Sequence, residues 1–187
     1  MPYTSNSTNK IELPTYFGDF LIRQVTSDDI EKAYEMRKNV ALESDTILSS
    51  PEEITIDGMR SWINSWLQAE RKLFVVVEDV KNSNIIVGQL WVWFLDTKKK
   101  TSHIAEFGLE ILNNYRGQGI GTKLTELAIA WAISKGAKRI EAETLEKNIP
   151  MRRIFDKFGF EQEGIKKSYL NVNGSYENAV MYSLIID

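Results

Sequence analysis

The chain has 187 residues, 43% of them hydrophobic, which is enough for one substantial core. Its net charge of −3 gives no long-range attraction for nucleic acid or for an anionic membrane. The sequence contains no cysteine, which excludes disulfides, a thiolate nucleophile and a cysteine-ligated metal, and which suits a reducing cytoplasm. We therefore expect a cytoplasmic protein that binds neither nucleic acid nor a membrane.

The chain divides into a short leading segment and one domain. Residues 1–10 are polar and rich in Ser, Thr and Asn, so we expect a flexible N-terminal segment there. Residues 11–187 show no linker or repeat and are expected to form a single α/β domain. Nowhere do eighteen apolar residues follow one another, so no membrane-spanning segment is predicted.

The first half of the chain predicts strands and two amphipathic helices. A capping cluster at Thr26–Asp29 starts a helix that carries Ile30, Ala33 and Val40. Apolar residues at helical spacing predict a second helix from Gly58 to Lys72. Strands are predicted over residues 20–25, 73–79 and 85–96, and the last of them is apolar on both faces, which indicates that both are covered.

The second half alternates strand and helix. Residues 105–112 are predicted as a strand, followed by a glycine turn, a helix to Lys135 and a closing Gly136. A strand over 139–144 precedes a short helix over 151–158, with Asn148 as its N-cap. Residues 168–172 and 175–185 are predicted to form a hairpin about an Asn173-Gly174 type I′ turn.

The glycine turn, Arg116-Gly117-Gln118-Gly119-Ile120-Gly121-Thr122, is the most informative motif. Glycines at a helix N-terminus leave backbone N–H groups open to a phosphate, and Arg116 adds a permanent positive charge. The alternative is a tight turn that only needs positive φ. The spacing fits neither the Walker pattern nor the dinucleotide fingerprint, although Glu141 lies where a ribose-binding acid would, which keeps a nicotinamide enzyme as a weaker possibility.

This arrangement resembles the acyl-CoA pyrophosphate loop, Arg-x-x-Gly-x-Gly, of the GNAT N-acetyltransferase superfamily. A second motif is similar too, Asn148 followed by a short helix that ends in Gly159-Phe160. The resemblance runs from about Phe20 to Ile185 and is nearest to the ribosomal-protein N-terminal and spermidine N-acetyltransferase branch. It implies a mixed, mostly antiparallel sheet of about seven strands with about four helices, and a V-shaped splay between strands 4 and 5.

The resemblance also implies the site. Acetyl-CoA would be a co-substrate for transfer to a primary amine, either a protein N-terminus or a small polyamine, by direct attack. Glu106 would be the general base, although a solvated or ion-paired glutamate is the competing interpretation. Trp62 and Trp66, on the second helix, are interpreted either as core residues or as a wall of the acceptor pocket. The residues expected to bind acetyl-CoA are Ile111, Leu112, Arg116, Gly117, Gln118, Gly119, Ile120, Gly121, Thr122, Asn148 and Phe155.

One departure from the family leaves an alternative open. Relatives often carry a tyrosine at the position of Phe155 to protonate the departing thiolate, and a phenyl ring cannot do so; water or Tyr169 would have to substitute. A non-catalytic acyl-CoA-binding or sensing module is therefore the alternative function. His103 is the only histidine, so we expect no metal site and no Ser-His-Asp hydrolase. The C-terminal hairpin is a possible site of homodimer formation.

Overall fold

The computed structural model describes residues 12–43, 49–172 and 174–187. The predicted flexible segment, residues 1–10, and Asn173 of the predicted turn lie outside them. Eight strands form one sheet in the order β1-β2-β3-β4-β5-β6-β8-β7. The strands are β1 (Thr15–Phe17), β2 (Phe20–Gln24), β3 (Lys72–Asp79), β4 (Ile85–Phe94), β5 (Ile104–Ile111), β6 (Arg139–Leu145), β7 (Glu161–Val172) and β8 (Ser175–Ile185). The α-helices of the described ranges are α1 (Ile30–Glu43), α2 (Ile56–Leu67), α3 (Ile120–Ser134) and α4 (Ile149–Phe158).

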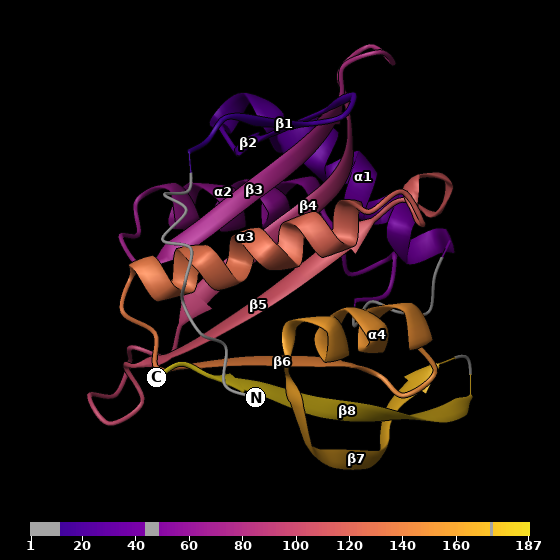
Figure 1. Cartoon of the computed structure of the whole chain (residues 1–187). Helices are drawn as coiled ribbons and strands as arrows, with labels where there is room; N and C mark the ends of the chain where they lie inside the picture. The colour runs from indigo at the N-terminus through magenta and orange to yellow at the C-terminus, as the bar shows by residue number, and fades with distance from the viewer. Residues whose placement is uncertain (1–11, 44–48, 173) are drawn as a thin grey trace.

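The helices cover both faces of the sheet (Figure 1). Helices α3 and α4 lie in front of it in this view, and α1 and α2 lie behind. On β4, Leu90 and Val92 are fully buried in the cluster under α3, while Trp91 and Trp93 pack on the α2 side. The expectation that this strand is covered on both faces is therefore confirmed.

All neighbouring strands are antiparallel except β5 and β6. These two pair in parallel at only three positions, from Ile104 opposite Arg139 to Glu106 opposite Glu141. Beyond Glu106 and Glu141 the two strands no longer pair with each other, although β5 continues to Ile111 and β6 continues to Leu145. This is the predicted splay. It was predicted between strands 4 and 5, and these strands are numbered β5 and β6 because the structure has one more strand, β1, before them.

The predicted sheet of seven strands is thus wrong by one strand. β1 has three residues and pairs only with β2 across the turn at Gly18, so it is too short for a clear alternating pattern. α2 ends at Leu67, and Lys72, predicted to end this helix, is the first residue of β3. β7 begins at Glu161, seven residues before its prediction, because this mostly exposed strand lacks apolar alternation.

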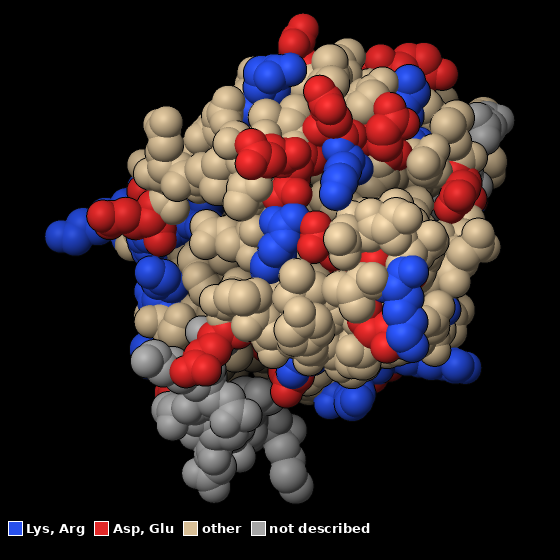
Figure 2. Space-filling view, turned by 90° about the horizontal axis from the view of Figure 1, so that it is seen from above, with Lys and Arg blue, Asp and Glu red and all other residues tan. Residues whose placement is uncertain are grey.

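One face of the molecule shows no dominant charge (Figure 2). On the face shown in Figure 2, acidic and basic side chains are interspersed among uncharged residues. No helix in the described ranges has the length and apolar character needed to cross a membrane. β7 is the last strand of the sheet, and its outer side is where the predicted pairing of two copies would form.

Candidate active site

The glycine turn lies at the beginning of α3. Gly117 and Gly119 have φ of +76° and +87°, which favours glycine, and Gly119 is the N-cap residue of the helix. Gly121 also lies in a tight place, because a Cβ there would lie 3.3 Å from Ile154 Cδ1. The turn and the first helical residues line a cleft of about 1110 Å³. An anion there would meet unpaired N–H groups and the positive end of the helix dipole.

Arg116 lies at the rim of this cleft. Its Nε donates a hydrogen bond of 2.9 Å to the carbonyl oxygen of Ile111, which holds the guanidinium beside the turn. Gln118 is exposed, and its amide donates to the Asn114 carbonyl over 3.2 Å. Arg116 and the turn glycines thus line the cleft, whereas Gln118 does not.

The gap between β5 and β6 is lined by alternate backbone groups of β5. Leu95 N–H donates to Ile104 O at one end of the β4–β5 ladder, and Leu112 N–H donates to Val87 O at the other. Even-numbered residues therefore direct their backbone groups toward β4, and Leu109 and Ile111 direct theirs toward the gap. Leu112 O also accepts from Tyr115 N–H, so both backbone groups of Leu112 are already paired.

Glu106 projects from β5 into the same cleft. It shares one sheet face with Gly108 and Glu110, as its spacing predicted, and lies opposite Trp93 on β4 and Glu141 on β6. Burial raises the pKa of the half-buried Glu106 carboxyl, and the negative charge of Glu141 raises it further. Interaction with the Trp93 indole opposes the shift. The carboxylate is thus a stronger base than an exposed glutamate.

The second sequence motif forms the other wall. Asn148 is the N-cap of α4: its side chain accepts from Met151 N–H over 3.3 Å and donates to Thr144 Oγ1 over 3.0 Å. Phe155 is 1% exposed and packs against Tyr182 with ring centroids 4.8 Å apart. Both residues line the cleft, although the side chain of Asn148 is hydrogen-bonded to the first turn of α4 and to β6.

Sequence reasoning missed a buried ion pair on the α1 side of the cleft. Arg37 of α1 and Glu110 of β5 are joined by an N–O distance of 2.6 Å, and their side chains are 15% and 4% exposed. Burial raises the pKa of Glu110 to about 7, against the opposing effect of Arg37. The second carboxylate oxygen of Glu110 has no hydrogen-bond partner. No sequence signal could identify this pair, because its members are 73 positions apart.

His103 is exposed and belongs to the turn before β5. Among the described residues, no group of three or more His, Cys, Asp or Glu side chains is placed to hold a metal ion.

One cleft joins the glycine-rich N-terminus of α3, a gap between splayed strands and a carboxylate with a raised pKa. A helix N-terminus suits an anion such as a phosphate group, and the cleft has room for a second molecule beside it. The acetyltransferase (GNAT) domain family matches residues 19–161. The chain belongs to this family, and the predicted enzyme class, an acyltransferase, is confirmed.

Individual relatives agree with this membership. A Bacillus subtilis protein, provisionally named as an N-acetyltransferase of a ribosomal-protein alanine, is 26% identical over 153 residues, covering 82% of this chain and 88% of that protein. An L-amino acid N-acetyltransferase of Escherichia coli is 30% identical over 98 residues, covering 50% and 58%. A phosphinothricin acetyltransferase of Sinorhizobium meliloti, solved with acetyl-CoA, shares the fold with a TM-score of 0.80 at 14% identity, covering 90% of this chain and 89% of that one.

Proposed function

We propose that this protein is a cytoplasmic enzyme that transfers an acetyl group from acetyl-CoA to a primary amine by direct attack in a ternary complex. The observation that carries the proposal is the single cleft of about 1110 Å³ that reaches from the glycine turn, along the β5–β6 gap, to Glu106. Such a cleft can hold both reactants at once, and much of the rate would come from holding them together.

The residues around the cleft suit a pyrophosphate and a polar arm. Gly117, Gly119, Ile120, Gly121 and Thr122 would face the phosphate groups, with Arg116 at the rim. The N–H groups of Ile111 and Leu109 would be offered to the arm and to the developing oxyanion, while the Ile111 carbonyl already accepts from Arg116. Leu112 is a weaker candidate than the sequence suggested, because both of its backbone groups are paired within the fold. Asn148 and Phe155 would shape the opposite wall.

Glu106 would accept the proton of the amine. A lysine-like amine with a pKa of about 10.4 costs roughly 4–5 kcal/mol to deprotonate at pH 7, whereas an α-amine costs about 1 kcal/mol. A base is therefore needed more for a side-chain amine than for a protein N-terminus. A carboxylate whose pKa is raised by burial is suited to this work and can act directly or through one water.

A tyrosine near Phe155 can take over the proton donation that a phenyl ring lacks. Tyr182 packs on Phe155, lines the cleft, and accepts a hydrogen bond of 3.0 Å from Arg152 Nε, which leaves its own O–H free to donate. Tyr169, the sequence-based candidate, is 48% exposed on β7 at the same cleft. We infer that Tyr182 is the better placed of the two.

The test is acetyl transfer to a panel of amines. The protein is incubated with acetyl-CoA and peptide N-termini, polyamines or free amino acids, and released CoA is read with a thiol reagent. Because the sequence contains no cysteine, every thiol detected is CoA. Release above background hydrolysis with one class of amine supports the proposal. Saturable acetyl-CoA binding without release from any amine would support the alternative, a non-catalytic acyl-CoA-binding or sensing module.

A further inference from the structure

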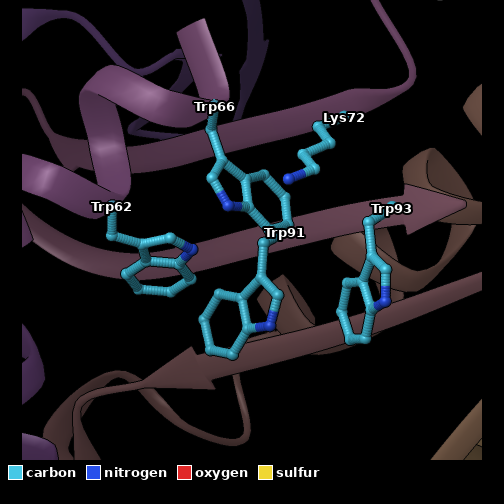
Figure 3. Close-up of a pocket in the computed structure, with 5 residues that line it drawn as sticks. All are labelled: Trp62, Trp66, Lys72, Trp91 and Trp93. Atoms are coloured by element: carbon cyan, nitrogen blue, oxygen red, sulfur yellow. The ribbon is translucent and has the colours of Figure 1, made fainter. Parts of the chain in front are cut away.

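A pocket of about 250 Å³ opens on the α1–α2 side of the sheet, lined by four indoles and one ammonium group (Figure 3). Trp62 and Trp66 come from α2, Trp91 and Trp93 come from β4, and the amino group of Lys72 points toward Trp66. This volume is below the roughly 300–1,000 Å³ of complete ligand sites, so the pocket suits one group of a larger molecule.

The tryptophan pocket, defined by these five residues, is continuous with the large cleft. Trp62, Trp91 and Trp93 line both. Trp93 also lies directly between Lys72 on β3 and Glu106 on β5, because it is the register partner of each. Side chains of directly opposite residues share one sheet face with Cβ atoms about 4.5–5.5 Å apart. A group in the pocket therefore places an attached amine beside Glu106.

We propose that the tryptophan pocket binds a flat, aromatic group of the acceptor, and that the preferred acceptor is a primary amine with an aromatic body and no second positive charge. This inference rests on the proposed acetyl transfer and names its substrate class. Indole edges and faces in the pocket already meet at tilted or T-shaped angles, with Trp62–Trp66 centroids 5.8 Å apart and Trp66–Trp93 centroids 6.1 Å apart. A further aromatic ring extends this packing.

The cations around the pocket disfavour a second ammonium group there. The Arg37 guanidinium lies 5.1 Å from the Trp62 ring centroid and 5.3 Å from that of Trp91, and Lys72 Nζ lies 5.4 Å from that of Trp66. Three of the four indoles thus have a cation of this chain on their rings. A second ammonium group on the acceptor would enter beside Lys72 and be repelled, whereas an uncharged or anionic group would not.

The fold holds the indoles in place. A Cβ at Gly108 would lie 2.7 Å from Trp91, so only glycine lets this indole lie against β5. Phe74, 2% exposed, packs behind Trp62 with ring centroids 4.8 Å apart. The pocket is therefore preformed, and little ordering of side chains is required when the acceptor binds.

The experiment compares three acceptors, 2-phenylethylamine, butylamine and 1,4-diaminobutane, by CoA release at saturating acetyl-CoA. We expect KM for 2-phenylethylamine to be at least about tenfold lower than for the other two, as one buried aromatic group accounts for such a factor. Trp66→Ala should remove this preference and leave KM for acetyl-CoA unchanged. Tyr176→Ala, at a 67% exposed aromatic residue on the hairpin, is the control and should change neither value.

A second variant is included in case Trp66→Ala does not fold, because Trp66 is only 8% exposed. Lys72→Glu changes a half-buried residue at the rim of the pocket. It should lower KM for 1,4-diaminobutane severalfold and should not raise KM for 2-phenylethylamine. Equal use of the three amines by the wild-type protein, or preference for the diamine, would overturn the inference while leaving acetyl transfer intact. If no amine releases CoA, the proposed transfer fails, and binding to the pocket is then tested by tryptophan fluorescence. Saturable quenching by 2-phenylethylamine would support the proposed aromatic site. No quenching would overturn it.

Discussion

At the scale of single residues, Glu106 decides how activity depends on pH. Burial raises the pKa of its carboxyl above the usual range, so the base becomes protonated, and activity falls, at a higher pH than for an exposed glutamate. Glu106→Gln should lower kcat/KM about 10²- to 10⁴-fold at pH 8. The ratio of wild-type to variant kcat/KM should shrink as the pH decreases through this pKa. Steady-state kinetics of the wild-type protein and the variant between pH 5 and pH 9 measure the loss of kcat/KM at pH 8 and the change of the ratio with pH.

The same substitution should stabilise the protein. A carboxyl whose pKa is raised in the folded state makes folding less favourable wherever the group is ionised, so this cost appears as the pH rises through the folded-state pKa. Gln cannot ionise, and we expect a higher Tm for the variant at pH 8 and no difference at pH 4. Loss of activity together with a lower Tm at pH 8 would contradict the assigned role, because it would indicate a structural glutamate.

Glu141→Gln is the companion variant. It should move the fall of activity at acidic pH to a lower pH and keep the activity at pH 8.

At the scale of elements, the ion pair of Arg37 and Glu110 joins α1 to β5 under the tryptophan pocket. Arg37→Ala leaves a buried carboxyl without its partner, which typically costs about 3–5 kcal/mol. Because burial raises the pKa of Glu110 to about 7, protonation relieves this cost, and the destabilisation should be large at pH 8 and small at pH 5. Chemical denaturation at the two pH values measures it. An equal loss of stability at both would show that the charge of Glu110 is not the cause.

The two ends of α3 allow a matched comparison of glycines. Gly117, before the helix, and Gly136, after it, have φ of +76° and +86°, and at neither does any atom lie within 4 Å of the place that an alanine Cβ would take. Alanine at either site should cost a similar backbone strain of about 1–2 kcal/mol. Only Gly117→Ala should also raise the Kd for acetyl-CoA, by tenfold or more, because its methyl group enters the cleft. Calorimetric titration of both variants tests this; equal Kd values would place the phosphate groups elsewhere.

At the scale of the whole molecule, local patterns predicted the elements, while long-range contacts determined what the sequence left open. The glycine turn, the N-cap Asn148 and the C-cap Gly159 could be predicted because each acts within a few residues of itself. The tryptophans could be recognised only one by one, because residues far apart in the sequence, such as Trp66 of α2 and Trp93 of β4, come into contact only in the folded chain. β1 and the first half of β7 were missed because short or exposed strands lack an alternating apolar pattern.

The parallel junction of β5 and β6 makes the sheet weakest where the cleft lies. Only three residue pairs join the two halves of the sheet, and beyond them Leu109 and Ile111 face a gap, whereas Leu112 already donates its N–H to Val87. A donor arm that enters this gap should pair with the odd-numbered residues alone. We expect acetyl-CoA to slow the amide hydrogen exchange of Leu109 and Ile111 at least about tenfold more than that of Leu112, as NMR can resolve. Uniform slowing along β5 would instead indicate a general stabilisation by binding, and would remove the argument that the gap holds the donor.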